Sequence, residues 1–488
     1  MERPADPLSA KGAGLCLARD VVHDLRTGGR RLLFHVPTSA LFELDALAGD
    51  MLDLFATHDV VGPDDLRTHF DGRAGPAAVV ETLSELLGLG ALRAPGERAA
   101  VRAPMAVERF PLATLVLNVN TGCNLSCTYC YKEDLTTPAK GKRMTFATAV
   151  DAFELLLREA ASRERVNLVF FGGEPLTNVP LIRQVVEYAE RRALEVEKTV
   201  DFTLTTNGTL LTAELIAWFD AHRFGLTVSM DGPRSLHDRN RRTVGGGPTY
   251  DVVAERARTL LARYRSRPVG ARVTLTAGVT DVVGIHRHLR DELGFFEVGF
   301  SPVTAGDAAG HNLDAHELAA VFSGMRRLGE DYVQGALRDE NIGFSNMHQL
   351  LTDVAHGMAK ALPCGAGVGM LAVDGDGGLN LCHRFTGSSL PTFGTVAGGI
   401  DRARLGAFLE AAQDRAGRPC ETCRIRHLCA GGCYHESYAR YGDPLAPVAH
   451  YCELLREWVD FGIAAYVRIL EHNPGFFARH LEPRRAPA

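Results

Sequence analysis

The feature that most constrains the fold is an alternation of strand-like and helix-like segments between residues 112 and 303. The strand-like segments are rich in Val, Leu, Phe and Thr. The segments between them carry apolar residues at helical spacing, as in Phe146, Val150, Phe153 and Leu157. The pattern predicts an α/β fold whose parallel sheet curls into an open, partial (β/α)6 barrel. The predicted strands are 114–119, 166–171, 201–206, 225–230, 271–279 and 297–301.

Length and charge narrow the function classes. A chain of 488 residues predicts about two to four domains. The formal net charge is −6, and acids and bases are mixed along the chain, which argues against a nucleic-acid partner. The first residues lack a basic segment followed by an apolar one, and no apolar run reaches membrane-spanning length. We therefore expect a cytoplasmic protein with no membrane partner.

Eleven cysteines are many for a cytoplasmic chain. Thiols stay reduced in that compartment, so close spacings indicate metal sites rather than disulfides. Cys16 stands alone and is assigned no role. The other ten form two sets. The first is Cys123, Cys127 and Cys130, and the second is Cys364, Cys382, Cys420, Cys423, Cys429, Cys433 and Cys452.

The first set lies in a loop that directly follows the first predicted strand, and we call residues 121–131 the cysteine loop. Three thiolates at these spacings can wrap one compact cluster. A 4Fe–4S cluster has four corners, so one iron would stay open to the amino and carboxylate groups of S-adenosylmethionine (SAM). The alternative is a zinc site, but structural zinc takes four protein ligands and the loop offers no fourth Cys or His.

The cysteine loop, with Tyr129 before its last cysteine, resembles the signature of the radical SAM superfamily. Segments 170–175, 206–208 and 229–233 follow the next three predicted strands and resemble further motifs of that superfamily. The segment 237–241 resembles a His-Asp-x-x-Arg element of its peptide-modifying branch. The resemblance implies reductive cleavage of SAM to a radical that takes hydrogen from carbon. The implied SAM contacts are Tyr129, Gly172, Gly173, Glu174, Pro175, Asn207, Ser229 and Arg241.

The second cysteine set resembles the SPASM iron–sulfur extension of radical SAM peptide maturases. The resemblance implies two auxiliary 4Fe–4S clusters, hence three in all. A four-cysteine group would hold one auxiliary cluster, and a three-cysteine group would hold the other. The missing fourth ligand of the latter could be open, another side chain or a substrate thiolate. One or two zinc sites are the alternative, since Cys-x2-Cys pairs are common zinc ligands. The four-cysteine group is Cys420, Cys423, Cys429 and Cys452, and the three-cysteine group is Cys364, Cys382 and Cys433.

Residues 1–95 predict a separate winged-helix-like domain, with strands at 15–25 and 31–36, helices at 40–54, 63–69 and 77–87, and extended chain at 89–92. The domain resembles the peptide-recognition domain of peptide maturases, where a leader segment adds as a strand to a sheet edge. A DNA-binding winged helix is the alternative, but no basic recognition helix is evident. A linker at 93–104 precedes the barrel domain at 105–310. A helical connector at 311–360, the SPASM domain at 361–455, and a C-terminal helix and tail at 456–488 follow.

Over nearly the whole chain, and most clearly between Leu115 and Met144 with the segment 131–135, the sequence resembles the maturases of quinohemoprotein amine dehydrogenase. That resemblance implies thioether bonds between Cys sulfurs and Asp or Glu methylene carbons of a small cysteine-rich polypeptide bound through the N-terminal domain. It also implies a low-potential electron donor such as ferredoxin or flavodoxin. The alternatives are a maturase of another peptide, of sulfatase or small-thioether type, and a non-catalytic iron–sulfur or zinc scaffold. No catalytic residue is assigned.

Overall fold

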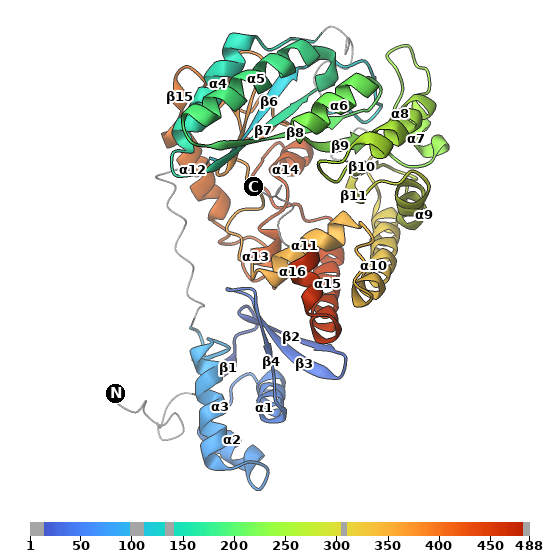
Figure 1. The fold of residues 1–488 in the computed structure, drawn as a ribbon. Coiled ribbons are helices and arrows are strands. Elements are labelled where there is room, and N and C mark those ends of the chain that lie inside the picture. Colours follow the sequence, from blue (N-terminus) through green and yellow to red (C-terminus); the bar gives the residue numbers. More distant parts are fainter. Residues whose placement is uncertain (1–13, 98–111, 132–140, 304–309, 482–488) are drawn as a thin grey trace.

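The computed structural model describes residues 14–97, 112–131, 141–303 and 310–481. Most of the predicted linker and residues 132–135 of the resembling segment lie outside these ranges. One continuous hydrophobic core joins the barrel to the C-terminal half of the chain, and a second, smaller core lies within the N-terminal domain. The N-terminal domain sits apart from the barrel, beside the last long helix (Figure 1).

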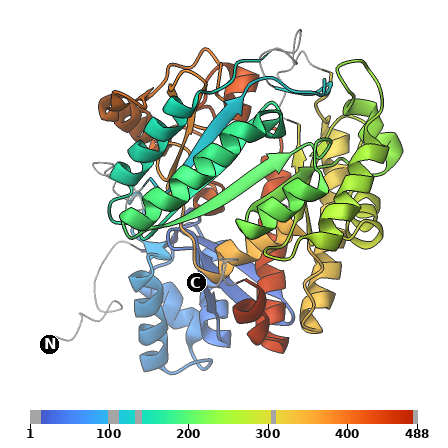
Figure 2. The ribbon, with the colours of Figure 1, turned by 45° about the horizontal axis from the view of Figure 1, so that its top comes forward.

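The predicted barrel is confirmed. Its strands hydrogen-bond in the order β11-β10-β9-β8-β7-β6, and each neighbouring pair is parallel. Helices α4 and α5 lie on the outer face of the sheet (Figure 2). The strands are β6 (Thr114–Asn120), β7 (Arg165–Gly172), β8 (Thr199–Thr206), β9 (Gly225–Ser229), β10 (Gly270–Leu275) and β11 (Glu297–Pro302). The helices are α4 (Phe146–Glu159), α5 (Val179–Glu195), α6 (Ala213–Ala221), α7 (Arg234–Asn240), α8 (Tyr250–Arg263) and α9 (Val282–Arg287), with short turns η1 (Pro175–Asn178) and η2 (His288–Glu292).

Alternation along the strands separates the two faces of the sheet. On β7, Val166, Leu168 and Phe170 are buried toward the helices, whereas the residues between them are only half-buried. The ring of Phe170 packs against that of Phe202 with centroids 6.1 Å apart, which fixes the outer face of neighbouring strands. The opposite, concave face lines the lumen of the open barrel. Polar residues at the carboxyl ends of the strands therefore point into or around one shared space.

The cysteine-rich region is built into the barrel sheet, which the sequence did not predict. Strand β12 (Met370–Val373) pairs in parallel with β6, and β13 (Leu379–Asn380) pairs antiparallel with β12. The buried amide of Asn118 donates to the carbonyl of Val373 and to the hydroxyl of Thr386, at 3.2 and 2.8 Å. The three-cysteine group is thus anchored next to the strand that leads into the cysteine loop.

Residues 311–360, predicted as a helical connector, contain α10 and α11, and the C-terminal end of the chain contains α15 and α16. The long helices α10 and α15 pack against each other below the barrel (Figure 1). The elements are α10 (Ala315–Leu337), α11 (Ser345–Ala355), β14 (Gly394–Thr395), β15 (Gly399–Ile400), α12 (Arg402–Gln413), α13 (Arg426–Cys429), α14 (Tyr434–Tyr441), α15 (Cys452–His472) and α16 (Gly475–His480). No helix in the described ranges combines the length and the apolar content needed to cross a bilayer.

The N-terminal domain contains a three-stranded sheet in the order β2-β3-β4 and three helices. The predicted helix at 40–54 is wrong in its first part, because residues 40–43 form strand β4. The helix starts only after Asp45, whose carboxylate accepts from the Ala48 amide at 2.7 Å. The elements are β1 (Cys16–Leu17), β2 (Val22–Thr27), β3 (Arg30–His35), β4 (Ala40–Glu43), α1 (Ala46–Thr57), α2 (Pro63–Phe70), α3 (Pro76–Gly88) and β5 (Leu92–Arg93).

Polar contacts hold the N-terminal domain against α15 and the cysteine-rich region. Asp460 on α15 accepts from His23 at 3.1 Å and from Arg424 at 2.8 Å. Arg426 donates to the Asp20 carbonyl at 2.6 Å. Strand β2 contacts α15, and β4 forms the other edge of the three-stranded sheet.

Candidate functional site

The cysteine loop is held by the segment that follows helix α7. The Ser126 amide donates to the Arg242 carbonyl at 2.8 Å, and the Thr128 amide donates to the Asn240 carbonyl at 3.0 Å. The Thr128 hydroxyl also donates to the Asn240 side chain at 2.8 Å. These bonds fix the backbone between the cysteines, so the three thiols are positioned by the fold before any cofactor binds.

The two glycines at the end of β7 allow that strand to pack on the cysteine loop. A Cβ on Gly172 would lie 2.2 Å from the Asn120 carbonyl oxygen, and one on Gly173 would lie 2.3 Å from the Gly122 carbonyl oxygen. The Gly173 amide donates to the Asn120 carbonyl at 2.8 Å. Glycine is therefore required here by the approach of the loop itself, in addition to any approach of SAM.

Glu174 ties the ends of β7 and β8 together. Its buried carboxylate accepts from the Leu176 amide and the Thr206 hydroxyl on one oxygen, at 3.0 and 2.8 Å, and from the Asn207 amide on the other at 2.7 Å. Burial raises the pKa of this carboxyl to about 7 against the opposing effect of these donors. Both oxygens are directed at the protein, and Pro175 continues into η1. Any SAM contact of this motif would therefore come from its backbone.

Tyr129, Asp231 and Arg241 form a buried cluster under the loop. Asp231 accepts from the Tyr129 hydroxyl at 2.7 Å, and Arg241 Nε lies 3.0 Å from the same carboxylate oxygen. The Arg241 guanidinium also lies over the Tyr129 ring at 5.5 Å. Burial lowers the pKa of Arg241, but the charge of Asp231 outweighs it and raises that pKa above its usual range. Asp231 was not among the predicted contacts, although it lies in the same motif as Ser229.

A second polar network borders Cys123. The Asn207 amide donates to the Asn124 side-chain oxygen at 2.9 Å and approaches the Cys123 sulfur at 3.8 Å. The Thr209 hydroxyl donates to Asn207 at 2.6 Å and accepts from Asn124 at 2.7 Å. Ser229 ends β9 and is half-buried on the lumen side of the sheet. The structure thus places the predicted SAM contacts around the cysteine loop and the ends of β7, β8 and β9.

The three loop thiols are close enough to perturb one another. Burial raises the pKa of Cys127 to about 12, and the charges of Cys130 and Cys123 add to the rise against the opposing effect of Arg241. Burial likewise raises the pKa of Cys123 to about 11. Thiolates at these positions therefore need a positively charged partner such as bound iron.

The seven later cysteines lie in two neighbourhoods that match the two groups named above. Burial raises the pKa of Cys429, and Cys452, Cys420 and Cys423 add to that rise. Burial raises the pKa of Cys382 to about 11, and Cys433 and Cys364 contribute to it. Every cysteine is a free thiol. Within the described ranges, no three His, Cys, Asp or Glu side chains are arranged to hold a single metal ion.

Tyr131 connects the cysteine loop to the three-cysteine group. Its ring packs edge-on against His435 of α14 at 5.4 Å, and the Arg384 guanidinium lies over it at 5.3 Å. Arg384 follows Cys382 by two residues, and His383 packs against Phe171 at the end of β7 with ring centroids 4.1 Å apart. The lumen between the two cysteine sets is therefore lined by aromatic and basic side chains. No local sequence pattern predicts this lining, because its residues come from distant segments.

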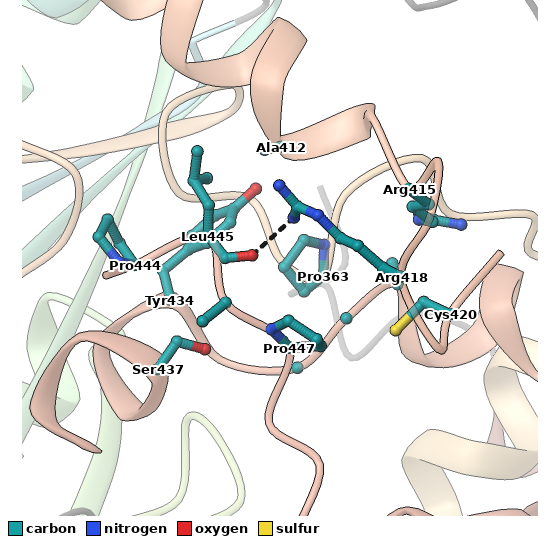
Figure 3. A pocket seen from close by; sticks show the side chains of 14 residues that line it. Pro363, Ala412, Arg415, Arg418, Cys420, Tyr434, Ser437, Pro444, Leu445 and Pro447 are labelled. Carbon is teal, nitrogen blue, oxygen red and sulfur yellow. Dashed lines mark hydrogen bonds between the residues drawn. The ribbon is translucent and has the colours of Figure 1, made fainter. Parts of the chain in front are cut away.

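Arginines surround the four-cysteine group. Arg456 Nη1 lies 3.8 Å from the Cys423 sulfur. Arg415 donates to the Ala361 and Arg426 carbonyls, and Arg418 donates to the Leu445 carbonyl at 2.7 Å. Figure 3 shows Arg415, Arg418 and Cys420 around a hollow of about 20 Å³. That volume suits about one water molecule, so the hollow is not a substrate site.

Comparison with known proteins decides the nature of the barrel. Residues 117–283 match the model of the Radical SAM superfamily, a range that begins within β6 and contains the cysteine loop and every predicted SAM contact. The barrel is a radical SAM domain. SAM and a 4Fe–4S cluster are therefore the cofactors that this domain binds.

Full-length relatives share this architecture. The chain is 22% identical over 387 residues to the cysteine-type anaerobic sulfatase-maturating enzyme of Clostridium perfringens, covering 74% of this chain and 98% of that protein. The structure of native anSMEcpe with bound AdoMet superposes with a TM-score of 0.62 at 20% identity, over 74% of this chain and 99% of that one. The structure of Streptococcus suis SuiB bound to precursor peptide SuiA superposes with a TM-score of 0.50 at 15% identity, over 90% and 100%.

The residues present fit the cofactors of such a domain. The charges of Cys123 and Cys130 both act on the Cys127 thiol, and three thiolate ligands would leave one corner of a four-iron cluster free for SAM. Nε of Arg241 forms the ion pair with Asp231. Within the described ranges, the two terminal nitrogens of Arg241 form no hydrogen bond. Those nitrogens can meet an anionic or hydroxyl group of SAM. When bound, the reduced cluster supplies the electron that breaks SAM into methionine and a 5′-deoxyadenosyl radical.

Proposed function

We propose that this chain is a radical SAM maturase that joins Cys sulfurs to Asp or Glu methylene carbons in a small cysteine-rich polypeptide. The finer form of the proposal is that this polypeptide is the small subunit of quinohemoprotein amine dehydrogenase. The observation that carries it is the three-cysteine group, which offers three ligands to a four-cornered cluster and is anchored by β12 beside the strand that leads into the cysteine loop.

The proposed reaction conserves atoms and electrons. The radical takes one hydrogen atom from a side-chain methylene and leaves as 5′-deoxyadenosine. The Cys sulfur would lose its proton to a base and bond to the carbon, and the three-cysteine group would hold the auxiliary cluster that takes up the remaining electron. One S–H and one C–H bond are broken, and one S–C bond forms. The chain's own task is to hold sulfur, carbon and SAM together and to exclude water.

A polypeptide substrate is supported by two features. SuiB, a protein whose structure contains a bound precursor peptide, resembles this chain over 90% of its length, including more than the barrel and the cysteine-rich region. Strand β4 forms an edge of the N-terminal sheet, and Phe42 on it is 37% exposed. An extended leader segment could add to this edge as a further strand.

The proposal also includes an electron donor, two auxiliary clusters and a cellular compartment. The chemistry needs one electron per SAM cleaved, which a ferredoxin or flavodoxin would deliver, and the two cysteine groups would hold two auxiliary clusters. Eleven free thiols suit a reducing compartment such as the cytoplasm.

The test is co-expression of the chain with a cysteine-rich polypeptide encoded beside it, followed by mass measurement of that polypeptide. Each thioether should remove about two daltons, and a strong thiol should not restore them, whereas it would reduce a disulfide. Fragmentation should place each link on an Asp or Glu side chain. An unmodified polypeptide, or one whose mass returns on reduction, would contradict the proposal.

A second candidate follows from the likeness to sulfatase-maturating enzymes, which covers 98% of the C. perfringens protein. In that case the substrate would lose hydrogen from the side chain of one Cys or Ser and gain an aldehyde, without a crosslink. An aldehyde-specific hydrazide probe separates the two products, because a thioether does not react with it.

A further inference from the structure

Arg272 occupies an unusual position in the lumen of the barrel. It lies on β10, where its neighbours Ala271 and Val273 are buried toward the outer helices, so the Arg272 side chain projects to the other face. That side chain is exposed, yet burial by surrounding protein lowers its pKa. A side chain in an open lumen combines the two properties, because protein surrounds it while its surface stays accessible to solvent.

The strand register places Arg272 beside the predicted SAM site. Arg272 is the direct partner of Ser229, the last residue of β9, and on its other side it pairs with Gly299 of β11. A Cβ on Gly299 would lie 3.2 Å from Arg272 Nη1, so the absence of a side chain there makes room for the guanidinium. The backbone of Arg272 is therefore level with the carboxyl end of β9, where SAM is expected, and its guanidinium lies next to Gly299 of β11.

Among the residues that the structure describes, none supplies a counter-charge to Arg272. Within the described ranges, no ion pair or hydrogen bond joins its guanidinium to another group, and the only neighbouring charge that affects its pKa is that of Arg384. The positive charge of Arg384 further disfavours the charged form of Arg272. A deeply placed guanidinium of this kind is stabilised when an anion binds, and the planar fork of Arg matches a carboxylate.

We propose that Arg272 is the receptor for a carboxylate that enters the lumen, namely that of the substrate's acidic side chain. The inference rests on the proposed function and adds the residue that selects its substrate class. A carboxylate held on Arg272 would place the adjoining methylene carbons beside SAM, where hydrogen is to be removed. The other possible source is the carboxylate of SAM, but that group is expected to bind the open iron of the cluster.

The probe for this receptor is glutarate, a dicarboxylate with the reach of a glutamate side chain, with uncharged glutaramide as its control. Calorimetry is done on SAM-loaded, oxidised holoenzyme, so no turnover is required. We expect glutarate to bind the wild-type protein about tenfold or more tightly than Arg272→Gln, consistent with a charge-assisted hydrogen bond. Arg272→Lys should retain more of this affinity than Arg272→Gln, and glutaramide should not distinguish the variants.

The matched control is Arg287→Gln, which removes the same charge from an exposed position on the outer helix α9. It should bind glutarate as the wild-type protein does. Equal glutarate affinity in wild type and Arg272→Gln, including no binding to either, overturns the inference. A loss of SAM affinity by the same factor in Arg272→Gln would assign the guanidinium to SAM instead. Because no product is measured, a failure of the thioether proposal would leave this result unchanged.

Discussion

The Tyr129 hydroxyl donates a 2.7 Å hydrogen bond to Oδ2 of Asp231, which links the cysteine loop to the end of the fourth barrel strand. The same oxygen lies 3.0 Å from Arg241 Nε. Asp231→Asn would leave the buried Arg241 without its counter-charge and should destabilise the protein by about 3–5 kcal/mol. Tyr129→Phe should cost only about 1.5–3 kcal/mol. Thermal unfolding of the two variants as anaerobic holoproteins shows which of them loses more stability. A greater loss in Tyr129→Phe than in Asp231→Asn would contradict the prediction.

Replacing any cysteine of the loop should separate SAM cleavage from the auxiliary clusters. Cys127→Ala removes a ligand from the loop, while the two later groups lie in neighbourhoods of their own. We expect reductive SAM cleavage to be abolished and the iron content to fall by about a third. Iron and 5′-deoxyadenosine are measured on the same anaerobic sample. Loss of all iron from a folded protein would show that the groups are not independent.

Arg456 should set the reduction potential of the four-cysteine group. Its Nη1 lies 3.8 Å from the Cys423 sulfur, and a cation at a ligand sulfur favours the reduced cluster. In an electrochemical titration of the holoprotein, Arg456→Gln should shift the midpoint potential of one iron–sulfur cluster to a more negative value. Arg468 lies on the same helix and pairs with the surface residue Glu330, so Arg468→Gln serves as the control. Equal midpoints in both variants would remove Arg456 from this role.

The N-terminal sheet should bind substrate without affecting SAM cleavage. Phe42→Glu places a charge on the edge strand β4 and should weaken binding of the polypeptide about tenfold, equivalent to about 1.4 kcal/mol. Phe146→Glu alters an exposed Phe on barrel helix α4 and is the control. Affinity is measured by pull-down titration, and cleavage of SAM without substrate is measured alongside. Unchanged affinity in Phe42→Glu would place the docking surface elsewhere.

Glu174 should make stability depend on pH. Its pKa of about 7 lies above its value of about 4.3 in an unfolded chain, so between these values the folded state binds more protons. The stability contributed by this group is therefore lost as pH rises toward 7. Glu174→Gln removes the titration, so the difference in unfolding midpoint between wild type and variant should fall from pH 5 to pH 8. A constant difference would show that Glu174 does not titrate in this range.

The barrel could be predicted from the sequence because each strand and helix carries its own local pattern. The predicted strand at 225–230 differs from β9 by one residue, and that at 271–279 runs past the end of β10 at Leu275. Strand β4 was missed because its apolar residues continue a helical spacing into α1, and only the cap at Asp45 divides the two. The pairing of β12 with β6 joins segments about 250 residues apart, which no local pattern records.

The candidate site, too, could be predicted from the sequence only where its residues lie in short motifs. The cysteines and the glycine-rich turn at the end of β7 lie in short motifs, so spacing alone brought them forward. Asp231 was passed over because its role depends on Tyr129 and Arg241, which only the fold brings to it. Arg272 has no motif at all. Its position follows from the register of β9, β10 and β11, and from the face of the strand on which it lies.

Thioether formation is tested by following the hydrogen atom that leaves the substrate. Purified protein is supplied with SAM, a low-potential reductant and the polypeptide carrying deuterium on its Asp and Glu side-chain methylenes. We expect deuterium to appear in 5′-deoxyadenosine, in step with formation of reduction-resistant crosslinks. Deuterium arriving only from polypeptide labelled at the Cys β-carbon, with an aldehyde as product, would contradict thioether formation and favour the sulfatase-type reaction.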